Sequence, residues 1–129
     1  MNKMKKRTRR RPVDAITPPT ATTVAAPTLT GRQAYIARLR AGETVSFRET
    51  GNSMTPKIRS RQKCTYAPVL SAADVEVGDA VFCKVGGNHF THLVTAIRGV
   101  QYQISNNHGH VNGWTTLDKI FGKVIAVED

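Results

Sequence analysis

The pattern of apolar and polar residues changes near residue 43, from the spacing of a helix to that of a β-strand. Before that point, three apolar side chains share one face of a predicted helix, at Tyr35, Ile36 and Leu39. Thr30 and Gln33 have the spacing of a capping box, and Gly42 is placed to end the segment. These signals predict one helix of about three turns within residues 30–42.

From residue 43 onward, β-branched residues and a period of two predict strands that are joined by turns. The turns carry Gly, Asn and Asp, which tight connections favour. Strands are expected at residues 44–49, 63–69, 80–85, 90–97, 100–105 and 123–127, with the turn after the fifth strand spanning 106–113. Helices and strands do not alternate, so a parallel sheet is not expected. The pattern predicts a small, mostly antiparallel β domain over residues 43–129.

Residues 1–29 have no such pattern and predict a disordered arm, first basic and then rich in Pro, Thr and Ala. Seven of the chain's 19 Lys and Arg residues lie within residues 1–11, which leaves 12 basic residues against nine acidic ones elsewhere. Most of the formal charge of +10 therefore belongs to the arm. A basic arm can neutralise phosphates without sequence preference, or it can be a solubilising tail, and both interpretations stay open.

Two further features of composition bear on the compartment. No apolar run of a secretory signal or of a membrane span is present, so a soluble, cytoplasmic protein without a membrane partner is expected. Cys64 and Cys83 are 19 residues apart and lack metal-site spacing, so they are expected to be buried free thiols.

The stretch TGNSMTPKI places one hydroxyl, that of Ser53, between Gly51 and Pro56. A serine becomes a nucleophile only when a base takes its proton, and the turn around it must offer N–H groups to an oxyanion. Gly51 permits an unusual backbone conformation, and Pro56 fixes the chain beyond the serine. The same spacing is more often that of an ordinary turn, so Ser53 needs a base from elsewhere in the fold.

His92 is the candidate base. It lies in a predicted strand on the same face as three apolar residues, Phe90, Val94 and Ala96. A buried imidazole is either satisfied by a local hydrogen bond, for example to a backbone carbonyl, or used in chemistry. The residues alone leave both alternatives open.

Five segments in order resemble those of the peptidase superfamily that includes LexA-type repressors and type I signal peptidases. They are GNSMTPKI, VEVGDAVFCKV, FTHLVTAI, YQISNNHGHVNGW and IFGKVIAV, and the resemblance covers roughly residues 46–127. The first resembles the family's nucleophile box, with Ser53 as the nucleophile. The second and last resemble its Gly-Asp-x-Val and Gly-Lys-Val strand starts. The resemblance implies a LexA/signal-peptidase-like antiparallel β domain that needs no cofactor.

The resemblance also implies roles for particular residues. Family members use a lysine base, but the signal peptidases of archaea and the endoplasmic reticulum place a histidine there, and His92 falls on that position. Ser53 would attack a peptide carbonyl, and His92 would act as base and then as acid. Asn106 matches the aspartate that orients the base in histidine-type members. The oxyanion would be stabilised by the nucleophile turn, formed by Gly51, Asn52 and Met54.

The expected function is that of a soluble serine endopeptidase that cleaves, or formerly cleaved, an extended peptide after a small residue. An amide can orient an imidazole but cannot stabilise the imidazolium as an anion would, so low activity is expected. The membrane anchor of signal peptidases and the helix-turn-helix domain of repressors are not evident in the sequence.

A stripe of basic residues after Ser53 suggests a second, non-catalytic class of function. Four residues recur at every second position and would project from one side of an extended backbone, beside Arg48: Lys57, Arg59, Arg61 and Lys63. Such a stripe could contact phosphates or an acidic partner, or it could be a solvated face. The rival is a non-catalytic module that binds nucleic acid or assembles a virion, as in a phage or mobile element, and it would act in the host cytoplasm or in the virion.

The four histidines allow one more alternative, a zinc site. It would require convergence across a hairpin of His89, His92, His108 and His110. Those spacings are loose, so no metal is expected.

Overall fold

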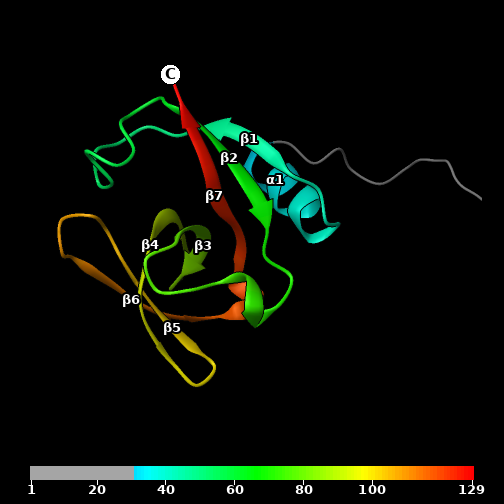
Figure 1. The fold of residues 1–129 in the computed structure, drawn as a ribbon, viewed down its shortest axis with the longest axis vertical. Coiled ribbons are helices and arrows are strands. Elements are labelled where there is room, and N and C mark those ends of the chain that lie inside the picture. Colours follow the sequence, from blue (N-terminus) through cyan, green and yellow to red (C-terminus); the bar gives the residue numbers. More distant parts are fainter. Residues whose placement is uncertain (1–30) are drawn as a thin grey trace, which may run out of the picture. The chain divides into compact units, whose positions relative to one another are not determined.

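The computed structural model describes residues 31–129, in which seven strands form one antiparallel, curled sheet (Figure 1). The elements in chain order are α1 (Gly31–Arg40), β1 (Val45–Arg48), β2 (Lys63–Pro68), η2 (Ala72–Asp74), β3 (Ala80–Val85), β4 (Asn88–Arg98), β5 (Gln101–Ser105), β6 (Val111–Thr116), η3 (Leu117–Lys119) and β7 (Ile120–Glu128). Across the sheet the order is β1-β2-β7-β3-β4-β5-β6, so β1 and β6 are the edge strands. The predicted mostly β, antiparallel fold with one short helix is confirmed.

The sequence predicts six of the seven strands and misses β6, which lies partly in the segment interpreted as a turn. Gly113 and the polar residues before it do not have the alternating apolar pattern that predicts a strand. A Cβ atom on Gly113 would approach Val85 Cγ1 to 3.1 Å, and its φ of +141° is one that other residues rarely adopt. This glycine therefore marks a close approach between strands rather than a turn. The predicted capping residue Thr30 and the basic arm lie outside the described residues.

Two hydrophobic clusters lie on opposite faces of the central strand β3. Val81 and Cys83 face one cluster, which β4, β5 and the start of β7 complete. Phe82, between them, faces the other cluster, which also contains Phe47 and Tyr66. The predicted free, buried thiols are confirmed, and Cys64 and Cys83 belong to different clusters. Because β3 is buried on both faces, it holds β4 and β7 in fixed register on either side.

Helix α1 packs on the second cluster near β1 and β7 (Figure 1). Its Leu39 is fully buried, and Gly42, with φ +90°, follows the helix as predicted. Gly122 on β7 allows α1 to approach the sheet closely. A Cβ atom at Gly122 would lie 3.0 Å from the Leu39 side chain and 3.1 Å from the carbonyl oxygen of Ala67. Residues 31–129 contain no helix that is long and apolar enough to cross a membrane.

Candidate active site

Ser53 lies on an exposed turn between β1 and β2, in a loop whose base is closed by backbone hydrogen bonding. The amide of Arg61 donates to the carbonyl of Glu49 at 2.8 Å, which joins the two ends of the loop. Met54 is only 4% exposed and anchors the turn, while the Ser53 side chain remains exposed. Gly51, at φ +119°, takes a conformation that favours glycine, as the sequence predicted for this position. The loop therefore presents the hydroxyl on a fixed support.

The structure brings Ser53 and His92 together, 39 residues apart in the chain. Ser53 Oγ lies 2.9 Å from Nε2 of His92. On the other side of the ring, Nδ1 lies 2.6 Å from the carboxamide oxygen Oδ1 of Asn112. A carboxamide oxygen can only accept, so Nδ1 carries the proton and Nε2 is left to accept the Ser53 proton. This is the tautomer that a general base requires.

Burial keeps the imidazole neutral. His92 is 5% exposed, and its ring stacks on Phe90 with centroids 4.6 Å apart. Burial lowers the pKa of His92 below its ordinary value of 6.5; the hydrogen bond to Asn112 opposes this shift, and His110 adds to it. The base is therefore unprotonated, and ready to accept a proton, at neutral pH.

Asn106 does not orient His92, which corrects the expectation from the sequence. Its Oδ1 accepts hydrogen bonds from the backbone amides of His108 at 2.8 Å and His110 at 3.0 Å. It thereby folds its own loop, a common role for an Asn side chain in turns. The residue at His92 is Asn112, on the strand β6 that the sequence did not reveal. Val111 and the run from Trp114 to Thr116 are a signal from which the strand, although not its register, could have been predicted.

The loop between β5 and β6 holds the nucleophile turn in place. The amide of Asn107 donates to the Ser53 carbonyl at 2.9 Å, and its side-chain Nδ2 donates to the Thr55 carbonyl at 2.9 Å. His108 Nε2 lies 3.0 Å from the carbonyl of Asn52, so this nitrogen must be the donor. No positioning role was predicted for Asn107 or His108.

A backbone N–H group of the nucleophile turn could stabilise an oxyanion only if it does not already donate a hydrogen bond. Gly51 is not one of them, because its N–H donates to Ser60 Oγ at 3.1 Å. The carbonyl of Asn52 accepts hydrogen bonds from Thr55. Within residues 31–129, the amides of Ser53 and Met54 donate to no acceptor. These two N–H groups lie beside the hydroxyl that would attack, which is where an oxyanion forms.

A small pocket of about 40 Å³ opens beside Ser53. Its walls combine apolar Met54 and Ile58 with the polar side chains of Glu49, Tyr66 and Thr91. Arg59 and Cys64 also line it. The pocket is therefore small and mixed in polarity, and it lies directly beside the candidate nucleophile.

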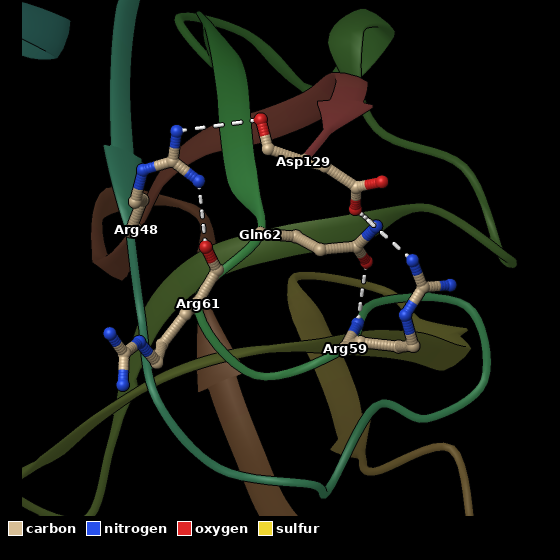
Figure 2. A network of polar contacts seen from close by, with 5 residues as sticks. All are labelled: Arg48, Arg59, Arg61, Gln62 and Asp129. Carbon is tan, nitrogen blue, oxygen red and sulfur yellow. Dashed lines mark hydrogen bonds and ion pairs between the residues drawn. The ribbon is translucent and has the colours of Figure 1, made fainter.

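The predicted basic stripe does not form. Residues 53–57 and 60–61 are turns, and Arg61 has φ +69°, so the backbone is not extended and alternate residues do not share a side. Figure 2 shows that the side chains of Arg59 and Arg48, with the carbonyl of Arg61, belong to a network of polar contacts around Asp129. Arg59 and Gln62 both contact Asp129 Oδ1, at 3.1 and 2.9 Å, and Arg48 donates to the Arg61 carbonyl at 2.7 Å. The stripe was wrong because it required an extended backbone, whereas this loop is rich in turns.

The zinc alternative also fails. His89 and His92 lie on opposite faces of β4, since His89 lies against Phe82 and Phe121 while His92 stacks on Phe90. In the part of the chain that the structure describes, no three His, Cys, Asp or Glu side chains are grouped to hold a metal ion.

No protein-family model matches the sequence, and no curated protein matches it as a relative. The chemistry of this site therefore has to be inferred from the positions of its own residues.

Proposed function

We propose that the chain is a serine endopeptidase in which Ser53 is the nucleophile, His92 the general base and Asn112 the residue that orients the base. One observation carries the proposal: the 2.9 Å contact from Ser53 Oγ to His92 Nε2, on a ring whose Nδ1–H is fixed by Asn112. Nucleophile and base within hydrogen-bond reach, with the base held by a third group, are the signature of an activated serine. The resemblance to LexA-type and signal peptidases supports the same assignment.

The chemistry follows from this geometry. Ser53 Oγ attacks the carbonyl carbon of a peptide bond while His92 Nε2 takes the hydroxyl proton. The C–N bond then breaks, and the imidazolium returns that proton to the leaving amine. A water molecule, deprotonated by the same nitrogen, hydrolyses the ester on Ser53 and restores the resting enzyme.

The residue that orients His92 determines the rate of turnover that we expect. Asn112 fixes the correct tautomer, but its neutral carboxamide does not stabilise the imidazolium as a carboxylate would. We therefore expect slow turnover, which suits a peptidase that processes few molecules of a specific substrate.

Two features support an extended peptide substrate with a small residue before the scissile bond. The pocket of about 40 Å³ beside Ser53 limits the size of the side chain that precedes the bond. The edge strand β1 leads directly into the Ser53 loop, and its outer edge is free to pair with a peptide strand among the described residues.

Labelling with a fluorophosphonate probe tests the proposal. We expect the wild type to be labelled and the Ser53→Ala variant to lose all labelling while keeping the fold of the wild type, because Ser53 lies on an exposed turn. Ser46→Ala is the matched control. Ser46 is an exposed serine on β1 whose hydroxyl contacts only that of Thr65, at 2.8 Å, within the described residues. Equal labelling of wild type and Ser53→Ala, or an unlabelled wild type across pH 6–9, would reject the nucleophile.

A further inference from the structure

The two N–H groups beside the Ser53 hydroxyl belong to consecutive peptide groups of the nucleophile turn. The N–H of Ser53 shares a peptide group with the carbonyl of Asn52, and the N–H of Met54 shares one with the carbonyl of Ser53. Both peptide bonds are trans, since the cis bond of this loop is Thr55-Pro56. In a planar trans peptide group the C=O and N–H bonds point in opposite directions. A hydrogen bond that fixes the carbonyl therefore also fixes the direction of the N–H.

The loop between β5 and β6 supplies a donor to each of these two carbonyls. The backbone amide of Asn107 donates to the Ser53 carbonyl at 2.9 Å. The side chain of His108 donates from Nε2 to the Asn52 carbonyl, 56 positions away in the chain, at 3.0 Å. Because both carbonyls point at this loop, both N–H groups point away from it.

The hydroxyl of Thr55 shows which atom of His108 carries the proton. Thr55 Oγ1 donates its single proton to the Asn52 carbonyl at 2.9 Å, so toward His108 Nε2, which is 3.1 Å away, it can only accept. Nε2 therefore carries a proton, which it shares between the Asn52 carbonyl and the Thr55 hydroxyl. The Thr55 amide adds a third donor to that carbonyl, at 3.2 Å. Three donors on one oxygen polarise the peptide group, and its N–H becomes a stronger donor.

His108 is exposed, but its backbone is held in place by Asn106. The side-chain Oδ1 of Asn106 accepts hydrogen bonds from the amides of His108 and His110, at 2.8 and 3.0 Å. The amide of Asn106 in turn donates to the carbonyl of His110 at 2.9 Å. These bonds close residues 106–110 into a tight turn, so the imidazole reaches the Asn52 carbonyl from a fixed support.

We infer that His108 is a positioning residue of the oxyanion site, because it holds and polarises the peptide group whose N–H belongs to Ser53. The inference rests on the proposed peptidase function and adds a residue that acts through this N–H. Charge develops on the substrate carbonyl oxygen only in the transition state, so loss of His108 should lower kcat and leave KM unchanged. Removing an oxyanion donor costs about 100- to 1,000-fold in kcat; here the donor remains and Thr55 still holds it, so we expect a loss of about tenfold.

Steady-state kinetics of two substitutions at position 108 test the inference. The substrate is a peptide that the wild type cleaves, found by mass spectrometry in a digested proteome. His108→Ala should lower kcat about tenfold at unchanged KM. His108→Gln should restore most of kcat, since its side-chain amide offers an N–H donor close to the position of Nε2. An unchanged kcat in His108→Ala, or a loss that His108→Gln does not reduce, would overturn the inference.

Lys57→Ala is the matched control. Lys57 is exposed on the same turn-rich loop as Ser53, and its side chain forms no hydrogen bond within residues 31–129. This variant should keep the kcat and KM of the wild type. A purely structural role for His108 would loosen the whole turn, and His108→Ala would then raise KM as well as lower kcat. That result would also overturn the inference.

An NMR spectrum of the free protein gives a measurement that needs no catalysis. The HNCO experiment correlates the carbonyl carbon of Asn52 with the amide of Ser53, which is the peptide group in question. In His108→Ala we expect both the carbon and the amide proton to shift upfield, because the carbonyl loses a donor. Both should stay near their wild-type positions in His108→Gln and Lys57→Ala. Unchanged shifts in His108→Ala would overturn the inference.

The inference and the proposed function fail in different ways. If the wild type shows neither cleavage nor fluorophosphonate labelling, the peptidase is refuted, and the inference falls with it whatever the NMR shifts. If the wild type cleaves peptides but His108→Ala keeps its kcat, only the inference is overturned and the peptidase stands.

Discussion

At the scale of single residues, the proposed chemistry depends on a carboxamide in a position where a carboxylate would stabilise the imidazolium more strongly. Asn112 Oδ1 lies 2.6 Å from His92 Nδ1, so any change of charge at this atom acts directly on the imidazole. Burial already lowers the pKa of His92 from 6.5, and Asn112 offsets this only in part. The base is neutral above its pKa, so activity should be lost as the pH falls through a midpoint below 6.5.

We expect Asn112→Asp to move that midpoint upward and to raise kcat on the alkaline plateau. A carboxylate beside Nδ1 stabilises the imidazolium, and an opposite charge at this distance shifts a pKa by about 1–3 units. The pH profile of kcat/KM and an NMR titration of the His92 ring measure the shift. Asn112→Ala should instead lower kcat, since the ring then loses its orientation. An unchanged midpoint in Asn112→Asp would show that residue 112 does not act on the base.

Protonation of His92 also changes the free energy of unfolding. In the unfolded chain His92 binds a proton at its ordinary pKa of 6.5, whereas in the folded chain it does so only at lower pH. Between these two values the unfolded state holds more protons, so the free energy of unfolding falls as the pH drops below 6.5.

Ser53 and His92 could be predicted from the sequence because each stands in a short, recognisable stretch. Asn112 could not, because its contact depends on the register between two strands. The pairing of β5 with β6 shifts between Ile104 and Ser105, and a shift of one residue turns a side chain to the opposite face of the sheet. Nothing in the order of residues decides whether Asn106 or Asn112 reaches the imidazole.

At the scale of elements, the candidate site forms where two loops, brought together by the sheet, contact each other. The loop after β1 carries Ser53, and the loop after β5 carries Asn107, whose backbone and side chain both bond to the Ser53 turn. The sequence predicts turns at the Ser53 stretch and at residues 106–113. It could not predict their contact, because the bonded residues are 52 positions apart and the curl of the sheet alone joins them.

We expect Asn107→Ala to slow the reaction more than it destabilises the fold. Loss of the Nδ2 bond to Thr55 should cost about 1 kcal/mol of unfolding free energy. The freed turn displaces the Ser53 hydroxyl from Nε2, and a misplacement of about 1 Å can cost on the order of 100-fold in rate. Probe labelling rates and thermal melts measure the two effects. The control Asn88→Ala, at the exposed first residue of β4, should change neither rate nor stability. Equal losses in both variants would remove the special role of Asn107.

At the scale of the whole molecule, the basic charge and the candidate chemistry belong to different parts of the chain. Several cationic side chains of residues 31–129 are occupied within the fold, as in the Arg59–Asp129 and Arg38–Glu43 pairs at 3.1 and 3.0 Å. The seven basic residues of positions 1–11 belong to a segment outside the described residues. Nucleic-acid binding, if the chain has it, should therefore depend on the arm and not on the loop of Ser53.

Deleting residues 1–11 tests this separation. If each of the seven basic residues neutralises one phosphate of duplex DNA, the slope of log K against log salt should become shallower by about six, since each contact contributes roughly 0.9. Fluorescence anisotropy over a series of salt concentrations gives the slope. Replacing Lys57 and Arg61 by Ala is the control with charge removed from the folded part, and it should leave the slope unchanged, whereas phosphate contacts by both residues would make it shallower by about two. Ser53→Ala should leave the slope unchanged, because an exposed hydroxyl on the folded domain carries no charge.

A slope that survives deletion of the arm would place phosphate contacts on residues 31–129, and would favour a nucleic-acid-binding module over a peptidase with a basic tail.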